Sequence, residues 1–311
     1  MARYLVTGGA GFIGSNIAEE LAKRGEDVVI LDDLSTGCEE NIEHIRSQIT
    51  FIKGDIRDAG MVKKSLDGVE YVLHQAALAS VPRSIKDPAL VNDVNVRGTL
   101  ILLEQSRLAR VKRFVYAASS SAYGDSEVLP KREDMVPRPL SPYAVSKLTG
   151  EHYCSVYTAV YGLPTVSLRY FNVFGPRQDP NSQYAAVIPI FISRLLRGEQ
   201  PTIFGDGEQS RDFTFVENVV EANILAAHWR HAAGQSINIA CGERYTLNEL
   251  FEHIREIVGC DLKPIYTDPR PGDVRHSQAD ISIARELLKY SVSVPFERGL
   301  ERTIDWYHNK T

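Results

Sequence analysis

Tyr143 and Lys147 are the two residues of the chain whose types and spacing most directly suggest proton chemistry. They follow Ser141-Pro142, a pattern typical of a helix start. Residues at i and i+4 share one face of a helix, so the phenol and the ammonium become neighbours. Tyrosine is a poor base at its ordinary pKa of about 10, and a nearby cation favours the phenolate. The pair can therefore move a proton, although an ordinary exposed pair is the alternative because this spacing is common by chance.

A serine-rich turn can supply a partner for this pair. Ala118-Ser119-Ser120-Ser121 follows a buried type of strand at Arg113–Ala117. Open α/β sheets bind ligands at the carboxyl ends of their strands. Ser119 can then hydrogen-bond the same substrate oxygen as Tyr143. Simple turn chemistry is the alternative for three serines in a row.

Glycines 8, 11 and 14 lie between a predicted strand and the helix that follows it. Glycine there permits a tight turn, close approach of a pyrophosphate and close helix packing, while the helix N-terminus offers N–H groups to an anion. Asp32 ends the next strand, where a carboxylate can accept both ribose hydroxyls of adenosine and would repel a 2′-phosphate. This pattern favours NAD over NADP. Asp55 and Ile56 follow the third strand and either hold the adenine or form a solvated loop.

Alternating strands and helices are expected to position these residues. Strands are predicted at Arg3–Thr7, Asp27–Asp32, Thr50–Lys53, Tyr71–His74 and Arg113–Ala117, and helices at Gly11–Arg24, Asp93–Arg107 and Tyr143–Tyr161. Such βαβ units predict an α/β protein with a Rossmann-type, doubly wound parallel sheet and a smaller C-terminal α/β lobe. We expect residues 1–171 to bind the dinucleotide and 172–311 to bind mainly the substrate, with a strand near 235–240 returning to the sheet. The proline-rich segment Leu129–Pro142 is expected to be a surface connection, and Thr202–Phe215 a hairpin.

Composition excludes several classes of protein. The chain has 311 residues, of which 43% are hydrophobic and 24% charged, which argues against disorder. A net charge of −5 argues against nucleic-acid binding, and the apolar runs are too short to span a membrane. No signal peptide is visible. The cysteines at 38, 154, 241 and 260 lack metal-ligand spacing, so we expect a reduced, cytoplasmic compartment and no structural metal.

With these motifs in view, the chain resembles the extended short-chain dehydrogenase/reductases, in particular the UDP-sugar 4-epimerases of the nucleotide-sugar epimerase/dehydratase group. The matching stretches are Thr7–Gly14, Asp32–Leu34, Asp55-Ile56, His74–Ala77, Asn95, Ser119–Gly124, Ser141–Lys147, Arg169–Asn172, Arg211–Phe213 and Arg270–Asp273. The resemblance implies a Rossmann domain with tightly held NAD. It also implies that Tyr143 is the base, that Lys147 tunes it and holds the nicotinamide ribose, and that Ser119 assists.

The resemblance further implies two sets of binding residues. Those for NAD are Gly8, Gly11, Phe12, Ile13, Gly14, Asp32, Asp33, Leu34, Ser35, Thr36, Gly37, Asp55, Ile56, Gln75, Ala76, Ala77, Asn95, Tyr143, Lys147 and Tyr170. Those for a UDP-sugar are Ala79, Ser119, Ser121, Asn172, Gln178, Ala186, Val187, Phe204, Arg211, Arg270, Asp273 and Ser277. In the second set the two arginines are expected to clamp the diphosphate with the help of Asn172, and Asp273 to bind the uridine ribose.

Departures from the family pattern narrow the reaction. Dehydratases of the group carry Asp-Glu directly after the residue that matches Ser119, whereas this chain has Ser120 and Ser121. Arg83 keeps a UDP-glucuronate epimerase or decarboxylase open as an alternative. Reversible 4-epimerisation remains: Tyr143 removes the C4 hydroxyl proton while the C4 hydride passes to NAD. The 4-keto sugar then turns about its diphosphate before the hydride returns to the opposite face.

Ser277 stands where strict glucose/galactose epimerases carry a bulky tyrosine. A small side chain leaves room for a 2-acetamido group, so we expect UDP-GlcNAc and UDP-GalNAc as substrates, with UDP-Glc and UDP-Gal also accepted. Ala79, Ser121, Gln178 and Ala186 match the other walls of that sugar pocket. A non-catalytic NAD sensor is the alternative of a different class, although such proteins usually lose the tyrosine or the lysine. Family analogy also suggests a homodimer.

Overall fold

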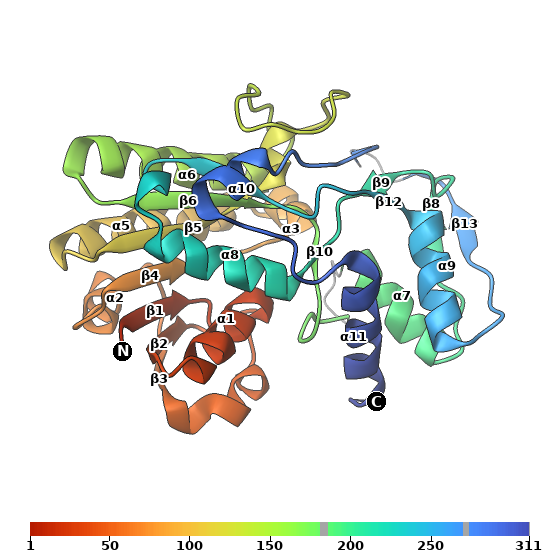
Figure 1. The fold of residues 1–311 in the computed structure, drawn as a ribbon, viewed down its shortest axis with the longest axis horizontal. Helices are drawn as coiled ribbons and strands as arrows, with labels where there is room; N and C mark the ends of the chain where they lie inside the picture. The colour runs from red at the N-terminus through yellow and green to blue at the C-terminus, as the bar shows by residue number, and fades with distance from the viewer. Residues whose placement is uncertain (181–185, 270–273, 311) are drawn as a thin grey trace.

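In the computed structural model, which describes residues 1–180, 186–269 and 274–310, seven strands form a parallel sheet (Figure 1). Their order is β11-β6-β5-β4-β1-β2-β3. The strands are β1 (Arg3–Thr7), β2 (Asp27–Asp32), β3 (Ile49–Lys53), β4 (Tyr71–His74), β5 (Arg113–Ser119), β6 (Thr165–Tyr170) and β11 (Ser236–Ile239). From β1 the chain adds β2 and β3 on one side of the sheet, and then β4, β5 and β6 on the other side. This reversal of strand order between β1 and β4 opens a crevice at the carboxyl ends of the strands. The predicted doubly wound α/β fold is confirmed, and β11 is the strand that was expected to return to the sheet.

Helices cover both faces of the sheet. On one face lie α1 (Phe12–Lys23), α8 (Val216–His228) and α10 (Ser282–Leu288), and on the other α2 (Ala59–Ser65), α5 (Thr99–Leu108) and α6 (Pro142–Tyr161). Successive strand residues point to opposite faces: Tyr4 and Val6 join the first apolar core, and Leu5 joins the second. Because both faces are covered, these strands are apolar along their whole length.

Local sequence signals set the bounds of α6. The Ser141 hydroxyl accepts the Ala144 N–H at 3.1 Å, Pro142 occupies the first turn, and Gly162 ends the helix with a φ of +69°. A proline at that position costs no hydrogen bond, and glycine tolerates the left-handed conformation that ends a helix. The predicted helix is therefore confirmed.

The chain between β4 and β5 is more divided than its pattern predicted. α3 (Val81–Lys86) and α4 (Pro88–Asn92) precede a π-helical turn, η3 (Asp93–Gly98), and α5 follows it. The expected helix Asp93–Arg107 is thus half π-helical. Such turns occur most often at functional sites. Three short 3-10 helices lie elsewhere in the first half: η1 (Glu39–Asn41), η2 (Glu43–Gln48) and η4 (Ser120–Tyr123).

The smaller lobe contains α7 (Val187–Leu196), α9 (Leu247–Val258) and α11 (Phe296–His308), on the right of Figure 1. The 3-10 helix η5 (Arg230–Ala232) follows α8. Three two-stranded sheets complete this part: β10 (Thr214–Phe215) with β7 (Val173–Phe174), β12 (Tyr245–Thr246) with β9 (Ser210–Arg211), and β13 (Ile265–Thr267) with β8 (Thr202–Phe204).

The prediction of a hairpin at Thr202–Phe215 is wrong. Each of its strands, β8, β9 and β10, pairs with a segment that is distant in the sequence. Gly205 and Gly207 both take positive φ, +80° and +78°, and this turn carries β9 away from β8. Within the described ranges, no helix combines the length and apolarity needed to cross a membrane.

Candidate active site

A cleft of about 1040 Å³ opens at the carboxyl ends of the strands. Most of the residues predicted to bind NAD line it. They are Gly8, Gly11, Phe12, Ile13, Gly14, Asp32, Asp33, Ser35, Thr36, Gly37, Asp55, Ile56, Gln75, Ala76, Ala77, Tyr143, Lys147 and Tyr170. Leu34 and Asn95, from the same predicted set, lie outside the lining.

The glycine loop is shaped for a close approach of the backbone to a ligand. Gly8 has a φ of +68°, and a Cβ there would lie 2.7 Å from the Ala76 nitrogen. A Cβ on Gly14 would lie 2.1 Å from the Gly8 oxygen. Gly11 begins α1 without a side-chain cap. The N–H groups of the first turn therefore remain available to a pyrophosphate.

Asp32 presents a buried carboxylate at the end of β2. It is 7% exposed, and its two oxygens accept the N–H groups of Ala10 at 2.9 Å and Leu34 at 2.8 Å. Burial raises the pKa of this carboxyl, while the two backbone hydrogen bonds act against that rise. Each oxygen keeps further acceptor capacity, as the two hydroxyls of a ribose require. Leu34, with a φ of +61°, thus orients Asp32 rather than lining the cleft.

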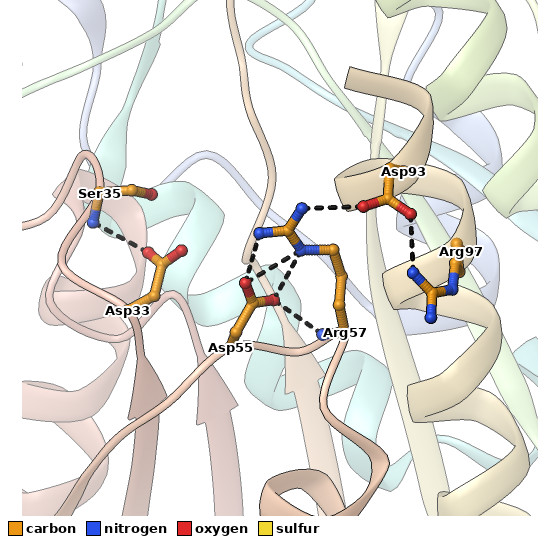
Figure 2. A network of polar contacts seen from close by, with 6 residues as sticks. All are labelled: Asp33, Ser35, Asp55, Arg57, Asp93 and Arg97. Atoms are coloured by element: carbon orange, nitrogen blue, oxygen red, sulfur yellow. Dashed lines mark hydrogen bonds and ion pairs between the residues drawn. The ribbon is translucent and has the colours of Figure 1, made fainter. Parts of the chain in front are cut away.

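Asp55 is held by hydrogen bonds from its neighbours, and its side chain is 31% exposed. Figure 2 shows Arg57 between two carboxylates: its side chain donates to Asp55 at 2.6 Å and to Asp93 at 2.8 Å. Arg97 in turn donates to Asp93 at 3.0 Å. The hydrogen bond from Arg57 lowers the pKa of Asp55. Asp55 therefore presents a fixed carboxylate to the cleft, and the network ties it to η3.

Asn95 acts behind the cleft wall. Its Oδ1 accepts the Leu78 N–H at 2.8 Å, and its Nδ2 donates to the Ser146 hydroxyl at 3.0 Å. Ser146 lies on α6 between Tyr143 and Lys147. Asn95 therefore joins a cleft-lining segment to the helix that carries the proton-handling pair.

His74 is a core residue, as the end of a buried strand would suggest. Its Nδ1 lies 2.7 Å from the Thr7 hydroxyl, and its Nε2 lies 2.8 Å from the Thr99 hydroxyl, which donates to the Asn95 carbonyl. Burial lowers the pKa of His74 to about 3. The imidazole is therefore neutral at working pH, with its proton on Nε2, and joins β1 to α5.

Lys147 and Tyr143 face the cleft from α6. The Lys147 side chain is buried, its Nζ donates to the Ala117 carbonyl at 2.7 Å, and it lies 4.9 Å from the centre of the Tyr116 ring. Burial lowers the pKa of Lys147 to about 8. Burial also raises the pKa of Tyr143, and a hydrogen bond with Ser119 opposes this rise. A positive charge brought beside Tyr143 would lower its pKa further.

Ser119 is the last residue of β5 rather than part of the turn that follows. Its Oγ accepts from the Ser121 hydroxyl at 2.8 Å and from the Ser121 N–H at 3.2 Å. These bonds hold the Ser119 hydroxyl at the carboxyl end of the strand, beside Tyr143. The arrangement can therefore bind and deprotonate a single hydroxyl group.

The residues predicted to bind substrate are brought together only in part. Ala79, Gln178 and Ala186 line the cleft, and Gln178 Oε1 is buried without a hydrogen-bond partner among the described residues. The Ser277 hydroxyl donates to Asn172 Oδ1 at 3.3 Å. The other described members of the set, which lie outside the lining, are Ser119, Ser121, Val187, Phe204 and Arg211. Arg270 and Asp273 fall outside the described residues.

Several lining residues had no assigned role in the sequence. Arg83 and Lys86 come from α3, Asp87 joins α3 to α4, Leu90 lies in α4, and Val94 lies in η3. Arg83 was weighed only as a mark of a different reaction. The short helices that carry these residues had no clear periodicity, so tertiary packing decides which of their side chains reach the cleft. Among the described residues, no cluster of three or more His, Cys, Asp or Glu could hold a metal ion.

The sheet, the glycine loop, the buried Asp32 carboxylate and the tyrosine–lysine pair together define an NAD-dependent enzyme of the extended short-chain dehydrogenase/reductase class. Residues 4–240 match the NAD dependent epimerase/dehydratase family. The chain belongs to this family, among its UDP-sugar 4-epimerases, and its cofactor is NAD. The cradle at Gly8 and the Asp32 carboxylate fit this cofactor.

Relatives, two of them with solved structures, match the chain along 99% or more of its length. A UDP-glucose 4-epimerase from Thermotoga maritima, solved with UDP-glucose, is 41% identical with a TM-score of 0.95, and covers 99% of each chain. A UDP-N-acetylglucosamine 4-epimerase from Methanobrevibacter ruminantium, solved with UDP-N-acetylmuramic acid, is 43% identical with a TM-score of 0.96, and covers 100% of this chain and 99% of its own. A UDP-glucose 4-epimerase from Mycolicibacterium smegmatis is 40% identical over 313 residues, 99% of each chain.

Proposed function

We propose that the chain catalyses the reversible 4-epimerisation of UDP-sugars with NAD as cofactor, and that it prefers UDP-GlcNAc and UDP-GalNAc while accepting UDP-Glc and UDP-Gal. The observation that carries the reaction type is that Tyr143 and Lys147 line the cleft that also presents the glycine cradle and Asp32, while Ser119 hydrogen-bonds Tyr143. The relatives named above support the same activity.

The chain's own groups handle the proton of the sugar hydroxyl. Tyr143 takes the proton from the C4 hydroxyl and later returns it, and Ser119 hydrogen-bonds the same oxygen. Lys147, anchored on the Ala117 carbonyl, places a positive charge one helical turn from Tyr143. NAD, when bound, would supply the acceptor for the hydride that leaves C4 and would return that hydride.

Inversion requires a firmly held diphosphate and a loosely held sugar. We assign NAD to residues 1–171 and the UDP group mainly to residues 172–311. Arg211 would clamp the diphosphate, and its side chain donates to the carbonyls of Ser210 and Arg275 at the start of β9. Asn172 would assist it, and Arg270 and Asp273 complete the proposed set.

Small side chains support the preference for acetylated sugars. Ala79 and Ala186 line the cleft, and Ser277 lies against Asn172. The test is to measure kcat/KM for both pairs of UDP-sugars in the wild type, in Ser277→Tyr and in Ser291→Tyr, where the same ring is added at an exposed site. We expect Ser277→Tyr to lose the acetylated pair selectively and Ser291→Tyr to change neither pair. A wild-type preference for the unacetylated pair, or equal loss of both in Ser277→Tyr, would overturn the preference.

UDP-glucuronate is the second candidate substrate, and the position of Arg83 favours it. This guanidinium lines the cleft and could pair with a carboxylate on the sugar. The relatives include a UDP-glucuronate 4-epimerase from Thermodesulfobacterium geofontis, 34% identical over 317 residues. Adding UDP-glucuronate to the same assay decides between the two candidates.

We also propose a homodimer formed through α5 and α6. Exposed apolar side chains gather on these helices: Leu108, Val145, Val156, Val160 and Tyr161. Arg107 lies over the Tyr161 ring at 5.6 Å, which extends the surface between the two helices. Apolar groups clustered in this way mark protein interfaces.

The four cysteines are free, which agrees with a cytoplasmic location.

A further inference from the structure

Asn223 is a fully buried polar residue in the middle of α8, outside the lining of the cleft. The helix packs across β4, β5 and β6, and the side chain of Asn223 is 0% exposed. Asparagine is a poor residue for a helix interior, and a buried amide is costly unless it is hydrogen-bonded. Its partners therefore show what it contributes.

The partners form a closed ring of hydrogen bonds. Asn223 Nδ2 donates to the Tyr170 hydroxyl at 2.8 Å, and Asn223 Oδ1 accepts from Gln75 Nε2 at 3.1 Å. The Tyr170 hydroxyl also lies 3.0 Å from Asn223 Oδ1 and 3.3 Å from Gln75 Oε1, and the second of these contacts closes the ring. The second N–H of the amide donates to the Val219 carbonyl at 2.7 Å, one turn back on α8. Every polar group of the Asn223 amide is thus engaged.

Both ring partners belong to the cofactor side of the cleft. Gln75 follows β4 and Tyr170 ends β6, so they lie on either side of β5, the strand that ends at Ser119. We propose that Asn223 is a positioning residue that holds Gln75 and Tyr170 in register across β5 for NAD binding. This inference rests on the cofactor site proposed above.

The ring needs a side chain that both donates and accepts. Leucine has the same number of side-chain heavy atoms as asparagine and the same branching but can do neither, and aspartate has the same shape but can only accept. Leucine removes the contacts with both Gln75 and Tyr170, and aspartate removes the N–H that donates to the Tyr170 hydroxyl. Ordering a mobile side chain costs conformational entropy when a ligand binds, so the affinity for NAD should fall.

Asn218 provides a matched control in the same helix. It is also 0% exposed, and it binds the Val294 carbonyl at 2.8 Å and the Val294 N–H at 3.1 Å. These contacts hold the chain that leads into α11, away from Gln75 and Tyr170. Asn218→Leu therefore removes an equally buried amide without touching the ring.

The experiment measures NAD retained after gel filtration and the Kd for NAD on stripped protein, alongside thermal unfolding. We expect Asn223→Leu to raise the Kd at least tenfold and Asn218→Leu to leave it within twofold, although both lower the melting temperature. At saturating NAD, the KM for the UDP-sugar should stay within twofold in Asn223→Leu. Wild-type retention of NAD in Asn223→Leu, or NAD loss in proportion to lost stability in both variants, would overturn the proposal.

A second variant, Asn223→Asp, tests the same proposal if Asn223→Leu does not fold. Asn223→Asp keeps the shape and loses the donor to Tyr170, so it should also weaken NAD binding. Combined with Tyr170→Phe it should add less than twofold, because the contact through which it acts is already gone. Additive effects would contradict the ring. The NAD retention and Kd measurements use no sugar, so failure of the proposed epimerase activity would leave their outcome unaffected.

Discussion

Replacing Lys147 by methionine tests whether this residue tunes Tyr143 by its charge. The two side chains are one helical turn apart, at a separation of roughly 6 Å. At an effective dielectric constant of about 20, a unit charge at that distance contributes about 2.8 kcal/mol, which corresponds to about two pH units. Lys147→Met should therefore move the rise of kcat/KM upward by about two pH units and lower the rate at pH 7 roughly 100-fold.

The assay is a pH–rate profile for UDP-sugar epimerisation at saturating NAD, because Lys147 also lines the cofactor cleft. Methionine leaves the Ala117 carbonyl without its 2.7 Å donor, so folding is checked by thermal unfolding. The variant is compared in a Tyr143→Phe background, where it should have little further effect on the rate. An unshifted pH profile with a reduced kcat would refute the electrostatic role and leave Lys147 with cofactor binding alone.

Three further changes probe the cofactor loop, the core and the proposed dimer. Gly14→Ala should raise the Kd for NAD at least tenfold by calorimetry, because its Cβ would lie 2.1 Å from the Gly8 oxygen; an unchanged Kd would contradict the cradle. Arg169 now binds the buried Glu151 carboxylate at 2.5 Å, and Arg169→Met would leave that charge unpaired. The variant should therefore lower the free energy of unfolding, measured in urea, by about 3–5 kcal/mol. A loss below about 1 kcal/mol would contradict this. Val156→Glu should give a monomer by light scattering, whereas a wild-type monomer would remove the dimer proposal.

The sequence predicted those parts of the site that depend only on residues adjacent along the chain. The glycine loop, the helix start at Ser141-Pro142 and the carboxylate at the end of β2 each follow from a short segment, and the structure contains them. The ring at Asn223 could not be predicted, because its members are 53 and 148 residues apart along the chain. An asparagine in a helical segment carries no signal of what it will meet across a sheet.

The same limit explains the errors in the smaller lobe. Residues 202–215 have the turns of a hairpin, but β8 and β9 pair with β13 and β12. A strand of two residues is too short to show the alternation of apolar and polar residues that predicts a strand. Its pairing is therefore determined by contacts with residues that are distant in the sequence. Ser119 extends β5 by two residues beyond the expected strand, because its register with β6 continues to Tyr170.

β11 has a consequence for any attempt to divide the molecule. It comes late in the chain, after β8, β9 and β10, yet it supplies the outermost strand beside β6. A fragment cut after residue 171 would leave β6 with a bare row of amide and carbonyl groups, which invites adhesion between molecules. Residues 1–171, which we propose to bind the nucleotide cofactor, should therefore not be excised, grafted or exchanged without this distant last strand.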